Sequence, residues 1–150
     1  MKILITYASI TGNTEKVARF LYRYAKQKLA QDQVVLADMT ELSPDKLAQY
    51  QLIVMGCSTW MDGDMNDVGL NFFDQLEATD VDLQNTQLAL FGLGDKRYHT
   101  YCTAVEIMAQ KLKHKNAVVS SNYLKIDGTP DEKVLSDTQN WLDQIVKELR

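Results

Sequence analysis

The chain has 150 residues, of which 45% are apolar and 24% are charged, with seven glycines and two prolines. This length and composition are typical of a single globular domain, and they exclude disordered, collagen-like and disulfide-scaffold proteins. The 16 basic and 20 acidic residues leave a net charge of −4. A mildly acidic chain without a basic run is poorly suited to bind nucleic acid or an anionic membrane, so we expect neither as a partner.

The cysteines and the apolar segments indicate a cytoplasmic protein. Cys57 and Cys102 belong to no Cys-x-x-Cys pair, which favours a reducing compartment. No stretch of the sequence approaches the roughly 20 apolar residues that cross a bilayer. The apolar stretch at residues 2–8 is too short for the core of a signal peptide.

Short apolar runs recur along the chain without alternation between apolar and polar residues. Such continuous runs are typical of strands that are covered on both faces. The predicted strands lie at residues 3–6, 34–37, 52–55, 88–91 and 117–119.

Apolar residues at helical spacing separate these strands. The stripes are Val17, Phe20, Leu21, Tyr24 and Leu29; Phe72, Phe73 and Leu76; Ala104, Val105, Met108 and Leu112; and Val134, Thr138, Trp141, Leu142, Ile145 and Leu149. Residues 43–45 predict a short helical turn, and Thr129 is expected to cap the last helix with Pro130 in its first turn. The sequence therefore predicts one α/β domain over residues 1–150, with a five-stranded parallel sheet and helices on both faces.

Ligands of such a fold bind beyond the carboxyl ends of the strands, at the switch point of the sheet. The loops that follow the first, third and fourth predicted strands are residues 8–14, 57–67 and 92–102. The residues capable of binding or chemistry are concentrated in these three loops, so we expect the functional site there.

The first loop combines three hydroxyls, an amide and a glycine at the start of a helix, which favours binding of an anion, and we expect a phosphate there. Its residues are Ser9, Ile10, Thr11, Gly12, Asn13 and Thr14. The alternative is an ordinary helix cap, which needs only one of them. The loop has neither the Gly-Lys-Ser/Thr of a Walker A motif nor the G-x-G-x-x-G of a dinucleotide site, so nucleoside triphosphate hydrolysis is disfavoured.

The other two loops carry aromatic residues among small and polar ones. Trp60 and Tyr98 are placed to stack on the two faces of a planar ring, and Gly92 and Gly94 allow a ligand to approach the backbone. The alternative is that Trp60 covers the end of the sheet. A phosphate and a planar ring together indicate a mononucleotide with a large ring system.

Four segments in order carry a resemblance to a known family. They read Tyr-Ala-Ser-Ile-Thr-Gly-Asn-Thr-Glu at 7–15, Gly-Cys-Ser-Thr-Trp at 56–60, Phe-Gly-Leu-Gly-Asp at 91–95 (followed by Tyr98 and Cys102), and Leu-Lys-Ile-Asp-Gly at 124–128. With them the chain resembles the flavodoxins, FMN-binding electron carriers with a doubly wound sheet. The run from residue 117 to residue 126 leaves no room for the extra loop of longer members, so the resemblance is to the short-chain type.

The resemblance implies a cofactor site with distinct parts. The first loop, the Ser58 hydroxyl and the Trp60 indole N–H would hold the FMN phosphate, while Trp60 and Tyr98 would stack on the flavin. The backbone of Asp95 and Cys102 and the carbonyl of Thr100 would bind the edge of the ring. The implied cofactor-binding residues are Ser9, Ile10, Thr11, Gly12, Asn13, Thr14, Ser58, Thr59, Trp60, Met61, Asp62, Gly63, Gly92, Leu93, Gly94, Asp95, Tyr98, Thr100, Tyr101 and Cys102.

Two local features depart from the family pattern. Many short-chain members carry glycine directly after the stacking tryptophan, where this chain has Met61 followed by Asp62 and Gly63. In the family, a peptide of this turn rotates when the flavin is reduced. Lys96 and Arg97 place two cations inside the third loop, beside a family docking surface that is usually acidic.

The function that the resemblance implies is one-electron transfer at low potential between reductases and acceptor enzymes, by a monomer that needs no metal. His99 and His114 form no carboxylate–histidine–nucleophile order, and the three loops supply no positioned acid or base, so we expect no catalytic residue. The alternatives are an FMN enzyme of similar fold, such as a quinone reductase or an activator of a metalloenzyme, and a phosphate sensor without redox function.

Overall fold

The computed structural model describes residues 1–60 and 62–149. The strands are β1 (Lys2–Ala8), β2 (Gln33–Asp38), β3 (Leu52–Ser58), β4 (Gln87–Gly94), β5 (Val118–Val119) and β6 (Leu124–Asp127). The helices are α1 (Asn13–Lys28), α2 (Asp67–Glu77), α3 (Thr103–Lys113) and α4 (Glu132–Glu148), with the 3-10 turns η1 (Met39–Glu41) and η2 (Pro44–Gln49). The short helical turn expected at residues 43–45 corresponds to η2, which begins at Pro44.

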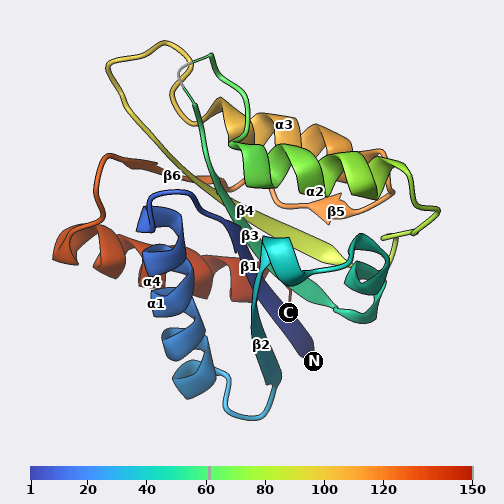
Figure 1. Cartoon of the computed structure of the whole chain (residues 1–150). Coiled ribbons are helices and arrows are strands. Elements are labelled where there is room, and N and C mark those ends of the chain that lie inside the picture. The colour runs from blue at the N-terminus through green and yellow to red at the C-terminus, as the bar shows by residue number, and fades with distance from the viewer. Residues whose placement is uncertain (61, 150) are drawn as a thin grey trace.

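The strands form one parallel sheet in the order β2-β1-β3-β4-β5 (Figure 1). The chain runs from β1 to the β2 edge and then crosses back to β3, on the other side of β1. The sheet therefore changes its winding direction between β1 and β3, where Ala8 pairs with Cys57. The predicted parallel, doubly wound architecture is confirmed.

Two segments share the edge position beside β4. Val118 and Val119 pair with its start, and Leu124 to Asp127 pair with its end at Phe91 to Gly94. The prediction of a single strand at residues 117–119 was therefore incomplete, because β6 alternates in burial as an exposed edge strand does. Between the two segments, the Asn122 carbonyl accepts the indole N–H of Trp141 at 2.7 Å, which ties the interruption to α4.

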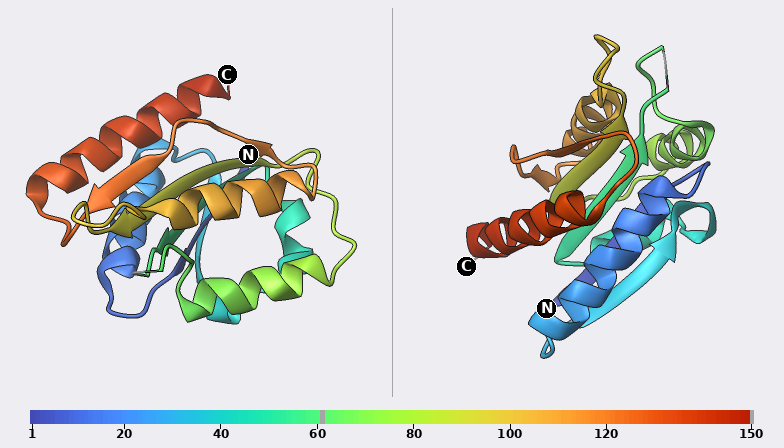
Figure 2. Two further views of the ribbon diagram at one scale, coloured as in Figure 1. Left: turned by 90° about the horizontal axis from the view of Figure 1, so that it is seen from above. Right: turned by 90° about the vertical axis from the view of Figure 1, so that its left-hand side faces the viewer.

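The helices cover the sheet in pairs, with α1 and α4 on one face and α2 and α3 on the other (Figures 1 and 2). Neighbouring residues of one strand enter different cores: Leu4 packs under α2 and α3, while Ile3 and Ile5 pack under α1 and α4. All three side chains are almost fully buried. Burial on both faces explains the continuous apolar runs of the sequence.

The start of α4 differs from the prediction. Asp131 caps the helix, since its carboxylate accepts the backbone N–H of Val134 at 2.9 Å. Thr129, the expected cap, and Pro130 precede the helix, and the Pro130 carbonyl accepts a hydrogen bond from Lys16 Nζ at 3.2 Å. Aspartate caps a helix as well as threonine does, so composition alone could not decide between the two positions.

Candidate cofactor site

The loop after β1 enters α1 without an ordinary cap. Gly12 occupies the cap position with a φ of 98°, and no side chain of the described residues caps the helix. The Ser9 hydroxyl oxygen accepts the Gly12 N–H at 3.1 Å and closes the loop on itself. A Cβ added at Gly12 would meet nothing within 4 Å, so the backbone faces open space at a positive helix end. This arrangement fits an anion and disfavours the ordinary-cap alternative.

The cations of α1 nearest this loop are directed elsewhere. Lys16 donates to the Pro130 carbonyl, and Arg19 Nε lies 2.7 Å from Glu15 Oε2. A phosphate in the loop would therefore be held by hydroxyls, an amide and backbone N–H groups, as the sequence predicts.

The loop after β3 is a tight hairpin that presents Trp60. The Gly63 N–H donates to the Trp60 carbonyl at 2.8 Å, and the Trp60 N–H donates to the Asp64 carbonyl at 3.0 Å. Trp60 is 49% exposed. The Thr103 hydroxyl, at the start of α3, donates to the Gly63 carbonyl and braces the hairpin. The predicted role of Met61 lies outside the described residues.

The loop after β4 descends into α3 through successive turns. The Tyr98 N–H donates to the Asp95 carbonyl at 3.1 Å, and the Tyr101 N–H donates to the Tyr98 carbonyl at 3.2 Å. Cys102 then adopts a left-handed conformation with a φ of 53° directly before α3. A Cβ at Gly94 would lie 2.9 Å from the Cys102 backbone nitrogen. The two ends of this loop therefore approach so closely that only glycine fits at position 94.

The two loops enclose a cavity of about 250 Å³. All its lining residues were predicted to bind the cofactor: Thr59, Trp60, Gly94, Asp95, Tyr98, Thr100, Tyr101 and Cys102. Trp60 and Tyr98 enter from different loops and remain 49% and 42% exposed. Two half-exposed aromatic rings beside a cavity fit the insertion of a flat ring between them.

Some predicted residues lie elsewhere. Gly92 and Leu93 are buried below the cavity, and a Cβ at Gly92 would lie 2.4 Å from Val105 of α3. The absent side chain of Gly92 therefore makes room for a helix, a role that the interpretation from the sequence did not include. Gly63 is buried and Asp62 is exposed, both in the hairpin after β3 and neither among the residues that line the cavity.

Comparison with known proteins decides the family. The flavodoxin family model matches residues 5–141. The chain belongs to the flavodoxin family. A flavodoxin of Maridesulfovibrio salexigens is 36% identical over 133 residues, which cover 87% of this chain and 88% of the relative. The crystal structures of oxidised Flavodoxin 1 and Flavodoxin 2 from Bacillus cereus superpose with TM-scores of 0.89 and 0.88. Their identities are 30% and 33%, and the matches cover 100% and 99% of both chains, respectively.

Membership of this family defines the cofactor and the kind of activity. Flavodoxins bind FMN and transfer electrons, so this chain is an FMN-binding electron carrier rather than an enzyme. Its 150 residues fit the short-chain form. The resemblance is thereby confirmed, and the alternative of an FMN enzyme is not favoured.

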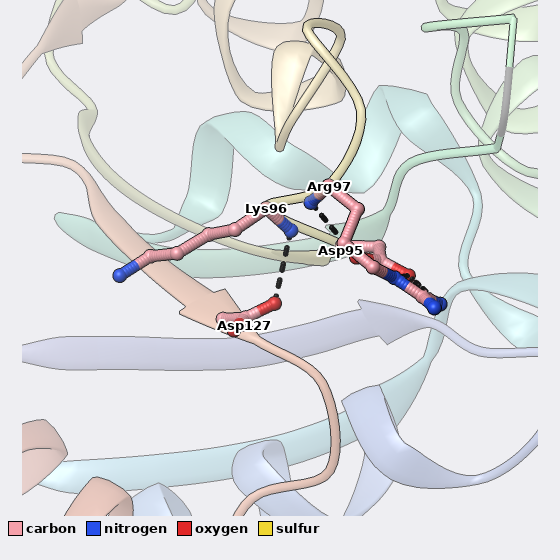
Figure 3. Close-up of polar contacts among 4 residues, drawn as sticks. All are labelled: Asp95, Lys96, Arg97 and Asp127. Atoms are coloured by element: carbon pink, nitrogen blue, oxygen red, sulfur yellow. Dashed lines mark hydrogen bonds and ion pairs between the residues drawn. The ribbon is translucent and has the colours of Figure 1, made fainter.

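The charges beside the cavity of this flavodoxin are largely paired (Figure 3). Arg97 folds back onto Asp95, with Nε 3.0 Å from both carboxylate oxygens, and these hydrogen bonds lower the pKa of Asp95 to about 2. The Lys96 backbone N–H donates to Asp127 Oδ1 of β6 at 2.9 Å, while the Lys96 side chain extends away from Arg97. With Asp127 included, the charges of Asp95, Lys96 and Arg97 sum to zero.

Both thiols of this flavodoxin are buried, and burial disfavours the reactive thiolate form. Burial raises the pKa of Cys57 to about 12 and that of Cys102 to about 11. The Cys102 thiol faces the Ile126 carbonyl at 3.7 Å, on the side of the sheet edge. Cys57 packs in the core beneath α2 and α3, as the sequence predicts, whereas Cys102 is buried and also lines the cavity.

Proposed function

We propose that this flavodoxin shuttles single electrons at low potential between reductases and acceptor enzymes, with residues 1–150 forming one FMN-binding domain. The observation that supports it best is the cavity between Trp60 and Tyr98. It lies at the carboxyl end of the strands, beside the switch point between β1 and β3, which is where sheets of this flavodoxin-like order bind their ligand.

The residues present fit FMN, and each loop contributes a different contact. We assign the phosphate to the loop after β1 together with the Ser58 hydroxyl and the Trp60 indole N–H. The flavin ring lies between Trp60 and Tyr98 in this assignment, with its edge against the backbone of Asp95 and Cys102. The Thr100 carbonyl accepts the Thr103 N–H at 3.1 Å, and a carbonyl oxygen can accept a second bond, which in this assignment comes from the flavin.

Bound FMN supplies the one-electron chemistry, and the chain binds it, orients it and shields one side of it. Three ionisable groups that line the cavity are unsuited to proton transfer at neutral pH. Asp95 is ionised by its bonds to Arg97, and burial keeps Cys102 protonated and raises the pKa of Tyr101. A cavity lined this way binds a redox group without offering an acid or base to a substrate, as a carrier requires.

An electron carrier requires redox proteins as partners, and the surface suggests their charge. Asp62 and Asp64 lie in the loop next to Trp60 and Asp67 begins α2, and a basic partner surface would complement these carboxylates. Among the described residues, no helix is long and apolar enough to cross a membrane. We propose that the protein works in the cytoplasm as a monomer, without nucleic acid or membrane as partner.

Purification followed by anaerobic reduction tests this function. We expect a yellow protein with visible flavin absorbance that accepts two electrons in two separate steps. It should pass them to a haem protein in the presence of a reductase, yet show no oxidation of NADPH by quinone on its own. A colourless protein that binds phosphate but no flavin would contradict the proposal and indicate a phosphate sensor. Turnover of NADPH with quinone by the protein alone would establish an enzyme.

A further inference from the structure

Asn66 is a fully buried polar residue between two parts of the candidate site. It lies directly before α2, and its exposed fraction is 0%. Its side-chain amide nitrogen donates to the Ala8 carbonyl at 2.8 Å and to the Ser58 hydroxyl oxygen at 2.8 Å. Ala8 ends β1 and Ser58 ends β3, so a single amide bridges the two strands where the sheet changes its winding direction.

The hydrogen bond to Ser58 determines where the Ser58 proton points. A hydroxyl carries one donor and two acceptor sites, and one acceptor site is filled by the Asn66 amide. That amide nitrogen cannot accept in return, so the Ser58 O–H must donate in another direction. No described residue accepts this proton. Ser58 follows Cys57, which pairs with Ala8, so Ser58 lies at the switch point, beside the loop that follows β1.

We infer that Asn66 is a positioning residue of the phosphate site, which holds Ser58 as a hydrogen-bond donor to the FMN phosphate. The inference rests on the proposed assignment of Ser58 to the phosphate. By anchoring the Ala8 carbonyl, the same amide also fixes the base of the loop that would hold the phosphate.

Asn66 also caps a helix, and this second role uses the side-chain oxygen instead of the amide nitrogen. Asn66 Oδ1 accepts the Gly69 N–H at 3.0 Å and so caps α2. Aspartate would cap the helix equally well. It would, however, offer only acceptors to the Ala8 carbonyl and the Ser58 hydroxyl when ionised, and it would draw the Ser58 proton away from the phosphate. The bridge therefore requires the amide, whereas the cap does not.

The test compares the affinities of the flavin-free full-length protein for FMN and for riboflavin, which lacks the phosphate. The ratio is the dissociation constant for riboflavin divided by that for FMN. It isolates the contribution of the phosphate, because a general loosening of the fold weakens the binding of both ligands. We expect Ser58→Ala to lower this ratio roughly tenfold or more, as loss of a bond to a charged group does. Asn66→Ala should lower it about three- to tenfold when Ser58 is present, but less than twofold in the Ser58→Ala background.

Two further variants separate the bridge from the helix cap. Asn66→Asp retains the cap of α2 and should lower the ratio at least as far as Asn66→Ala. Tyr24→Phe removes a hydrogen bond between α1 and Asp143 of α4, about three turns beyond the start of α1, and should lower the stability of the protein with an unchanged ratio.

The outcomes distinguish the two levels of the proposal. If Ser58→Ala leaves the ratio unchanged, the assignment of Ser58 to the phosphate is wrong and the inference falls with it. If Ser58→Ala lowers the ratio but Asn66→Asp does not, the site stands and Asn66 is only a helix cap. If Asn66→Ala lowers the ratio equally in the presence and absence of the Ser58 hydroxyl, Asn66 does not act through Ser58, and the inference is wrong.

Discussion

Neutralising Lys96 tests whether a charge beside the cavity sets the second reduction potential of the flavin, the step that leaves an anionic ring. The Lys96 side chain extends away from the Asp95–Arg97 pair and forms no ion pair with any residue that the structure describes (Figure 3). Its positive charge therefore acts on the flavin without a carboxylate bound to it. We expect Lys96→Gln to lower the second potential.

The size of the shift follows from Coulomb's law. A unit charge about 10 Å from the ring, at an effective dielectric constant near 40, contributes about 0.8 kcal/mol before screening by salt. Since about 1.4 kcal/mol corresponds to 59 mV in a one-electron step, the expected fall is about 35 mV. The shift should shrink between about 0.01 M and about 1 M salt, as the Debye length falls from roughly 30 to 3 Å.

The ion pair beside Lys96 provides a matched comparison. Arg97 and Asp95 carry opposite charges at nearly the same place, because Arg97 Nη2 lies 2.5 Å from Asp95 Oδ2. Arg97→Gln removes a second cation. The double variant Lys96→Gln/Arg97→Gln should therefore lower the second potential further than Lys96→Gln alone. Replacing both members of the pair, in Asp95→Asn with Arg97→Gln, should change the potential far less than Lys96→Gln.

Potentiometric titration at both salt concentrations measures these shifts. Lys113→Gln, at the far end of α3, is the control and should leave the potential unchanged. The alternative is that Lys96 and Arg97 act only in docking a partner. An unchanged second potential in Lys96→Gln, with an altered rate of electron transfer from a reductase, would refute the electrostatic argument.

Four further predictions concern single features of the site and core. FMN should bind at least about 100-fold more tightly than riboflavin, because several charge-assisted bonds to the phosphate are lost with riboflavin; equal affinities would contradict the phosphate assignment. Met61→Gly should raise the first reduction potential by roughly 40–80 mV. When the peptide of this turn rotates on reduction, the turn requires a positive φ, which glycine adopts without the cost of about 1–2 kcal/mol that another residue meets. A potentiometric titration that shows no rise would contradict this explanation. Thr103→Val loses the brace on Gly63 and should weaken FMN binding about fivefold in a fluorescence titration, with Thr103→Ser as the rescuing control. The free energy of unfolding should fall as pH rises from about 9 toward the raised pKa values of Cys57 and Cys102, about 12 and 11, because the unfolded chain releases these protons first. Urea titrations of Cys57→Ala should show a shallower fall.

The fold could be predicted where burial repeats a simple pattern. β1, β3 and β4 are covered on both faces, so their residues read as uninterrupted apolar runs. β6 escaped prediction because Lys125 and Asp127 of this edge strand face solvent. Whether a short sequence of alternating character forms an edge strand depends on the partner strand, which here is the far end of β4.

The site could be predicted to the level of loops but not of the bonds between them. Hydroxyls, glycines and aromatics directly after buried strands mark a ligand edge, and the cavity lies there. The bond from Lys96 to Asp127 spans 31 residues, and that from Thr103 to Gly63 spans 40. No local pattern marks such pairs. Gly92 and Gly94 look alike in the sequence. Only the packing of α3 shows that Gly92 makes room for the helix, whereas Gly94 makes room for the backbone of Cys102.

The site edge of this flavodoxin is held by polar bonds rather than by packed apolar side chains. Leu4 and Phe91 are wholly buried in the two cores, whereas Trp60 and Tyr98 are about half exposed. Loops held this way open locally before the cores unfold. Global unfolding of the flavin-free protein therefore reports on the cores, while the affinity for FMN reports on the loops. A substitution such as Thr103→Val can then weaken cofactor binding with little change in the stability of the flavin-free chain, and FMN in hundredfold excess over its dissociation constant adds about 2.7 kcal/mol to the folded state.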